Sequence, residues 1–367
     1  MPYRSPFPPA TFVIPICLLA LAGCGNPPTA CPASNCSYLY AAGNYNSQMA
    51  AFPVNASTGA LGSPITIPGP SASFGITAFN GQFLYASDSQ PTAAFGSSID
   101  AWSINAGTGK LAAVPGSPFA IPPVSQAGGL AIDNDIQVLY VGDVGKIDAF
   151  KIEADGALTP IVGSPFPAAD NLNITIDPQH RFLFGADDTP PGNILAFTID
   201  SSTGALTPVP GSPFVIGAAS ANGQLVLSDI VVDSSGKFLY VAIEQGNRVV
   251  GFSIMASNGA LLPLPGSPFE TASGPDALAT AHNFLYVSSP FNLSGYGIDP
   301  QTGVLTPLPG SPFANNSASL TADPQGKFLF DTGGVNVTAY EIDAQGRLTQ
   351  VGTTPNTAAG SALTYVP

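Results

Sequence analysis

Few residues in this chain could carry out acid–base or metal chemistry. Its 367 residues include 23 Asp and Glu, 9 Lys and Arg, 4 Cys and 2 His. With His180 and His282 as its two histidines, the sequence argues against a multi-histidine metal centre. Carboxylates are the most numerous reactive groups. We therefore expect a site built on them, either as a general base or as oxygen ligands for Ca²⁺.

The charge balance excludes two classes of partner. The formal net charge is −14, and charged residues make up 9% of the chain, against about 25% in an average soluble domain. Nucleic-acid binders and polybasic membrane-surface segments need clustered Lys and Arg, so neither is expected. Hydrophobic residues make up 45% of the chain, which is enough to bury a large core.

The first residues look like an export signal. Arg4 precedes an apolar run over residues 12–22, which is shorter than the roughly 20 residues that span a bilayer and fits a signal-peptide core. Leu21-Ala22-Gly23-Cys24 then resembles the lipobox of bacterial lipoproteins, in which the cysteine carries lipid. We expect a signal peptide over residues 1–23, lipid on Cys24, and anchoring at the outer membrane or cell surface. An ordinary cleaved signal is the alternative.

Residues 24–35 are predicted to form a tether to the membrane. Of the four cysteines, Cys17 lies within the signal and Cys24 is the predicted lipid site. Cys31 and Cys36 remain. In an exported chain we expect them to form a small disulfide loop.

The rest of the chain repeats one unit seven times. Each unit has an apolar–aromatic triplet, such as Phe238-Leu239-Tyr240, and about 20 residues later a glycine turn followed by leucine, as at 302–305. Most units then close with Gly-Ser-Pro-Phe. Because this segment recurs, we expect Gly-Ser-Pro to end the fourth strand and the Phe to fill a gap between units.

Each unit is predicted to contain four short strands. In the fifth unit we expect strands at Ile230–Val232, Phe238–Ala242, Val249–Ile254 and Leu261–Leu264, separated by Gly- and Asn-rich turns. Four-stranded units of this length are typical of β-propeller blades. The sequence therefore predicts an all-β, seven-bladed propeller of antiparallel blades over residues 36–367.

The two ends of the repeat predict how the ring closes. No innermost strand precedes the first triplet, whereas Ser361–Tyr365 looks like an innermost strand with no triplet after it. We expect this C-terminal strand to complete the first blade, which removes exposed sheet edges. The innermost strands carry small residues at alternate positions, as close packing around an axis requires.

The segment Asp323–Phe330, together with the Thr-Gly-x-Leu turns, resembles the lactonase-like propellers of the 6-phosphogluconolactonase type and the related YVTN surface repeats. The resemblance covers residues 36–367. In those enzymes an Arg-His pair leads into the innermost strand of a middle blade, and a glutamate follows that blade's second strand. Glu244 stands at the glutamate place, whereas Ser228 and Asp229 replace the Arg-His pair.

The match implies one kind of site, and the carboxylates at the channel mouth allow a second. Lactone opening needs a base for water and positive charge for the oxyanion, which Glu244 and Arg248 would supply; an exposed ion pair between them is the alternative. Carboxylates at the channel mouth could instead hold Ca²⁺. These candidate binding residues are Asp229, Asp276, Asp187 and Asp188. His180 and His282 fall in turns at the opposite end, where we expect solvated side chains.

Because the catalytic set is incomplete, we expect a lipid-anchored binding or scaffold module of the cell envelope. Its partner would be an envelope protein, a glycan or a small molecule, and the chain would be a monomer without an organic cofactor. A lactone hydrolase is the alternative that the resemblance implies.

Overall fold

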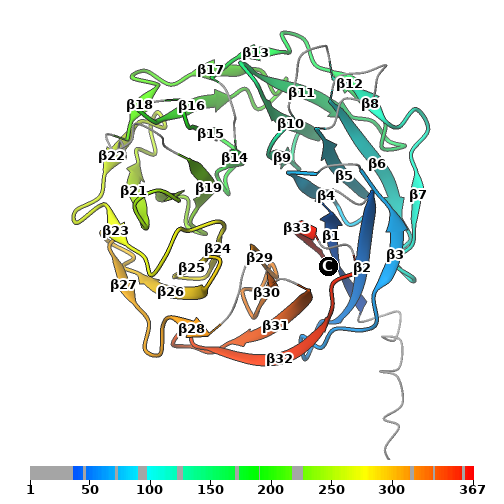
Figure 1. Cartoon of the computed structure of the whole chain (residues 1–367). Helices are drawn as coiled ribbons and strands as arrows, with labels where there is room; N and C mark the ends of the chain where they lie inside the picture. Colours follow the sequence, from blue (N-terminus) through cyan, green and yellow to red (C-terminus); the bar gives the residue numbers. More distant parts are fainter. Residues whose placement is uncertain are drawn as a thin grey trace, which may run out of the picture.

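The computed structural model describes residues 36–43, 47–70, 73–89, 97–121, 127–169, 173–189, 191–216, 226–314, 318–333, 335–357 and 360–367. The predicted signal peptide, Cys24 and the tether over 24–35 lie outside these residues. In the described part of the chain all regular secondary structure is β-strand, and the strands form seven antiparallel sheets. Figure 1 shows these sheets as blades around one axis, which confirms the predicted propeller. No helix in the described ranges has the length and apolar character needed to cross a membrane.

Each blade runs from an innermost strand to an outer strand. The innermost strands of blades 1 to 7 are β33 (Gly360–Val366), β4 (Ile76–Phe79), β9 (Leu130–Asp133), β14 (Asn173–Ile176), β19 (Leu227–Val232), β24 (Leu278–Ala281) and β29 (Ser319–Ala322). The second strands are β1 (Cys36–Gly43), β5 (Phe83–Asp88), β10 (Val138–Asp143), β15 (Phe182–Asp187), β20 (Phe238–Ile243), β25 (Phe284–Ser288) and β30 (Phe328–Gly333).

The third strands are β2 (Gln48–Asn55), β6 (Ser98–Ile104), β11 (Lys146–Ile152), β16 (Asn193–Ile199), β21 (Arg248–Ile254), β26 (Asn292–Ile298) and β31 (Asn336–Ile342). The outer strands are β3 (Ile65–Pro68), β7 (Leu111–Ala113) with β8 (Phe119–Ala120), β12 (Leu158–Pro160) with β13 (Phe166–Pro167), β17 (Leu206–Pro208) with β18 (Phe214–Val215), β22 (Leu261–Pro263) with β23 (Phe269–Glu270), β27 (Leu305–Pro307) with β28 (Phe313–Ala314), and β32 (Leu348–Pro355).

The C-terminal strand closes the ring, as predicted. β33 pairs antiparallel with β1, so that blade 1 has the order β3-β2-β1-β33. Leu363 lies opposite Ala41 and Thr364 opposite Tyr40 in this register. In Figure 1 the red β33 lies beside the blue β1 on the inner side of the first blade. The two ends of the propeller are therefore held in one sheet.

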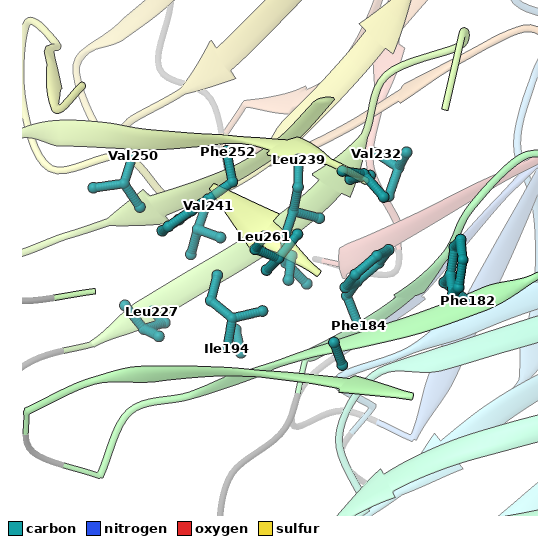
Figure 2. Packing of buried hydrophobic residues seen from close by; sticks show 14 of the residues in the cluster. Phe182, Phe184, Ile194, Leu227, Val232, Leu239, Val241, Val250, Phe252 and Leu261 are labelled. Atoms are coloured by element: carbon teal, nitrogen blue, oxygen red, sulfur yellow. The ribbon is translucent and has the colours of Figure 1, made fainter. Parts of the chain in front are cut away.

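The cores lie between neighbouring blades. Figure 2 shows Phe184 and Ile194 of blade 4 facing Leu239 and Val241 of blade 5. Phe184, Ile194, Leu239 and Val241 are each fully buried. The side chains of one sheet thus pack onto the next, as the apolar face of a strand requires.

The glycine turns and the triplets meet at these same seams. Tyr240 donates a hydrogen bond from its hydroxyl to the Gly303 carbonyl of the next blade, 2.7 Å away. Gly303 has a φ of +71°, and a Cβ on it would lie 2.5 Å from Cδ1 of Phe238. Equivalent hydroxyl–carbonyl bonds are Tyr40–Gly109, Tyr85–Gly156, Tyr140–Gly204 and Tyr286–Gly346. The triplet of one blade thus fits the turn of the next.

We expected Gly-Ser-Pro to end the fourth strand. In the structure it interrupts this strand, which then resumes. In blade 5, β22 and β23 both pair with β21, and residues 264–268 leave the sheet between them. The Ser267 hydroxyl accepts the backbone N–H of Gly251 at 3.0 Å, in place of the missing ladder carbonyl. Phe269 then packs against the apolar cluster between blades 5 and 6, which confirms the role expected for the Phe.

Replacing Gly303 by alanine tests this seam. We expect Gly303→Ala to lower the free energy of unfolding by about 2–4 kcal/mol, because alanine is strained at this φ and its Cβ collides with Phe238. Gly107→Ala is the matched control. Gly107 lies in the corresponding turn of blade 2, and the atom nearest to a Cβ at this position would be 3.6 Å away. Urea unfolding measures both, and equal losses would contradict the prediction.

Candidate functional site

One end of the central channel is a shallow hollow, which we call the channel mouth. Its volume is about 230 Å³. All seven blades contribute to its lining, through residues in the innermost strands or just before them. The lining residues are Phe74, Gly75, Ile76, Gly129, Leu130, Asn173, Ile174, Ser228, Asp229, Asp276, Ala277, Ala318, Ser319, Leu320, Ala362 and Leu363. No Lys, Arg or His is among them.

Two glycines let the inner strands come close together here. A Cβ on Gly75 would lie 2.8 Å from the carbonyl oxygen of Gly128, and one on Gly129 would lie 2.9 Å from the backbone nitrogen of Ile174. The expectation of small residues at the axis is therefore met at these two positions. This close approach keeps the channel narrow on the side of blades 2 to 4.

The residues at the Arg-His places form hydrogen bonds between blades. The Ser228 hydroxyl donates to the carbonyl of Pro275 at 2.5 Å, and Oδ2 of Asp229 accepts the N–H of Leu278 at 2.8 Å. On the other side, Nδ2 of Asn173 donates to the Ser228 carbonyl at 2.7 Å. These bonds link blades 4, 5 and 6 around the channel. Ser228 and Asp229 thus hold the mouth together.

Asp276 lines the mouth, and Glu244, which is not a lining residue, lies close enough for its charge to act on Asp276. Asp276 is half-buried in the mouth, and Glu244 is exposed at the start of the β20–β21 connection, where its side chain packs over Gly274. Neither carboxylate receives a hydrogen bond within the described residues. Burial, together with the nearby Glu244 charge, raises the pKa of Asp276 to about 6. Burial also raises the pKa of Asp229 to about 6, against two backbone N–H bonds that lower it.

Arg248 lies on the same connection as Glu244 without pairing with it. Arg248 begins β21 opposite Ile243, and its guanidinium lies over Gly246, where a Cβ would be 3.1 Å from Nε. Within the described part of the chain, Glu244 takes part in no ion pair. The structure therefore does not form the exposed ion pair that was the alternative to catalysis.

The mouth brings together part of the carboxylate set considered for Ca²⁺. Asp229 and Asp276 line it, whereas Asp187 and Asp188 are not among its lining residues. Asp187 is buried, and its oxygens accept the N–H of Thr189 at 2.9 Å and the Nδ2 of Asn193 at 3.0 Å. Asp187 therefore shapes its own loop.

The opposite end of the channel has a larger hollow of about 410 Å³. His282 lines it and is exposed, as predicted. Asp323 also lines it, with both oxygens bonded to backbone N–H groups of Phe328 and Gln325. The prediction of a solvated side chain was wrong for His180, because its Nδ1 lies 2.7 Å from Oδ1 of the buried Asp133 in blade 3.

The predicted disulfide joins a described residue to one outside the described ranges. Cys36 is half-buried at the start of β1, and burial raises the pKa of its thiol. Cys31 lies outside the described residues, so the Cys31–Cys36 bond stays a prediction.

Sequence reasoning missed the hydrogen bonds between the inner strands. Asn173 and Asp229 stand where blades 2 and 3 have Gly75 and Gly129. This change from glycine to a residue that forms side-chain hydrogen bonds, in two adjacent blades, is the signal that could have indicated a bonded rim.

Comparison with solved structures places the fold among known propellers. No protein-family model and no curated protein matches the sequence. The proposed 6-phosphogluconolactonase of Bacteroides uniformis is similar with a TM-score of 0.70 at 15% identity, over 90% of this chain and 100% of that one. That of Bacteroides fragilis gives 0.69 at 18%, over 90% and 98%. The periplasmic gluconolactonase of Pseudomonas aeruginosa gives 0.70 at 15%, over 90% and 99%. The chain thus shares the seven-bladed fold of these proteins.

The pKa of Asp276 predicts a pH-dependent effect of its replacement. Because its folded-state pKa of about 6 lies above the ordinary 3.8, its contribution to stability is fully present below pH 3.8 and is lost as pH rises through 6. We expect Asp276→Asn to raise the free energy of unfolding at pH 8 by about 1 kcal/mol, after allowance for solvent screening. At pH 4 we expect no change.

Asp299→Asn is the control with the opposite sign. Backbone N–H groups of Thr302 and Gln301 lower the pKa of Asp299, so its loss should destabilise the protein at pH 8. Urea unfolding at pH 4 and pH 8 measures both variants. Equal effects of Asp276→Asn at the two pH values would show that its charge does not oppose folding.

Proposed function

We propose that this protein is a binding module of the cell envelope, exported and held by lipid on Cys24. Its channel mouth takes a small cationic ligand and releases it unchanged. Asp276 and Glu244 carry this proposal, because they are neighbouring carboxylates without a donor within the described residues. A bound cation would lower the cost of holding two like charges together.

The size and charge of the mouth support a small positive ligand. A volume of about 230 Å³ suits a single ammonium-bearing group or a hydrated metal ion. The lining has two half-buried carboxylates and no basic side chain. A cation therefore meets a complementary potential, whereas a phosphorylated or carboxylate ligand meets repulsion.

The same features argue against acyl-transfer chemistry at this mouth. An oxyanion needs a preorganised donor or a cation directed at it. Ser228 and Asp229, which occupy the Arg-His places, are bonded between blades. A lactone hydrolase, with Glu244 as base and Arg248 as the positive charge, remains the alternative, favoured by the gluconolactonase among the structural neighbours.

Calorimetric titration with putrescine, with Ca²⁺ and with neutral glucose tests the ligand class. We expect a cation to bind and glucose not to bind. Asp276→Asn and Glu244→Gln should each weaken binding at least 10-fold, because each removes one of the two paired charges. Glu341→Gln, an exposed glutamate on β31 away from the mouth, is the matched control and should bind normally.

The arms of this experiment separate the candidates. Binding of putrescine alone indicates an organic ammonium ligand, and binding of Ca²⁺ alone indicates a metal. Failure of both cations, or equal loss of binding in Glu341→Gln, would overturn the proposal. Hydrolysis of gluconolactone that disappears in Glu244→Gln would replace it by the lactone hydrolase.

The anchoring is tested at Cys24. We expect Cys24→Ser to move the protein from the membrane fraction to the soluble fraction and to remove the acyl mass from its N-terminal peptide, since the thiol is the group that takes the lipid. Cys17→Ser, inside the predicted signal, should leave the protein in the membrane. Mass spectrometry of the fractions measures both. Lipid retained in Cys24→Ser would contradict the anchor.

A further inference from the structure

Three side chains with metal-binding atoms meet at the seam between blades 3 and 4. Asp133 ends β9, Asp135 follows in the next turn, and His180 lies in the β14–β15 turn of the neighbouring blade. Nδ1 of His180 lies 2.7 Å from Oδ1 of Asp133 and 3.9 Å from Oδ2 of Asp135. The three donor atoms lie within 4.8 Å of one another. This cluster is at the end of the channel opposite the mouth.

Asp133 differs from the aspartates at the same place in other blades. In blade 5 both oxygens of Asp233 are used: Oδ1 accepts the N–H groups of Lys237 and Phe238, and Oδ2 accepts the N–H and hydroxyl of Ser235. Asp177 and Asp323 likewise use both oxygens.

At Asp133 all the hydrogen bonds end on one oxygen. Oδ1 accepts the N–H groups of Asp135 and Ile136 and contacts His180. Oδ2 has no donor within the described residues, although the Asp133 side chain is only 2% exposed. Oδ2 is not among the buried unsatisfied atoms of the described residues, so it keeps contact with solvent. A carboxylate oxygen that receives no donor from the protein can exchange water for a ligand that carries positive charge.

We propose that Asp133, Asp135 and His180 bind a divalent transition-metal ion, with Zn²⁺ as the best match. One imidazole nitrogen and two carboxylates suit Zn²⁺, whereas Ca²⁺ prefers an all-oxygen shell. Water would complete the coordination. The Asp135 side chain is 82% exposed and is therefore free to move the short distance to the ion.

The surrounding charges permit this ion. Lys151, on β11, directs its ammonium to the carbonyl of Ile136 at 2.6 Å. Arg181 is paired with Asp177 at 3.0 Å. Both cations thus have their own partners. Because the ligands come from two blades, the ion would link blades 3 and 4 across their seam, and binding would stabilise the folded protein.

Equilibrium dialysis of the metal-stripped protein against Zn²⁺ tests the site, on a preparation without a histidine tag. We expect one Zn²⁺ per chain and a rise in Tm on binding. His180→Gln and Asp135→Asn should each weaken binding at least 10-fold. With Co²⁺ in place of Zn²⁺, we expect visible d–d absorption that His180→Gln abolishes, which reports the nitrogen ligand directly.

His282→Gln is the matched control, because His282 is the other histidine and occupies the corresponding turn of blade 6. It should bind Zn²⁺ like the parent protein. Absence of binding would show that Asp133 and His180 form a hydrogen bond between blades and nothing more. Binding that persists in His180→Gln, or that is lost in His282→Gln, would place the metal elsewhere and overturn the proposal. Asp135 is exposed, so its variant should fold even if His180→Gln does not.

Discussion

At six of the seven seams of this propeller an aromatic ring of one blade covers a glycine turn of the next, and Val138 takes the place of the ring between blades 3 and 4. Phe238 over Gly303, with the Tyr240 hydroxyl on the Gly303 carbonyl, shows the arrangement. The turn needs glycine for two reasons, because its φ is positive and because the ring leaves no space for a Cβ. The buried carbonyl is satisfied by the neighbouring blade instead of by water. Since the ring is closed by β33, each of these seams is braced by all the others.

Much of this architecture could be predicted from the sequence, because the same pattern of four strands and their turns occurs seven times. The predicted strands of blade 5 agree with β19 to β21 apart from their ends, and the closing strand pairs as expected. The outer strand was mispredicted at Gly-Ser-Pro. A local pattern shows that proline leaves the ladder. It does not show that the Ser267 hydroxyl takes over a ladder bond and that the strand then resumes.

The site was less predictable, because it depends on contacts between blades that no repeat encodes. Asp229 was a candidate ligand, and it turns out to hold Leu278 of the next blade. Asp276 was a candidate binding residue, and the structure places it near Glu244 with a raised pKa. The Asp133–His180 contact joins residues 47 positions apart. Such a contact follows from the angle between two blades, which spacing along the chain does not contain.

The interrupted outer strands also limit how the edge of the propeller could pair with the backbone of another chain. In five blades the rim is broken into runs of two or three residues by Gly-Ser-Pro. A short, broken rim is a poor template for another chain's backbone. Blade 7 lacks the interruption, and β32 continues as one strand from Leu348 to Pro355, with a bulge at Val351. If two copies crowded on a surface ever joined through their backbones, β32 is where the joining would begin.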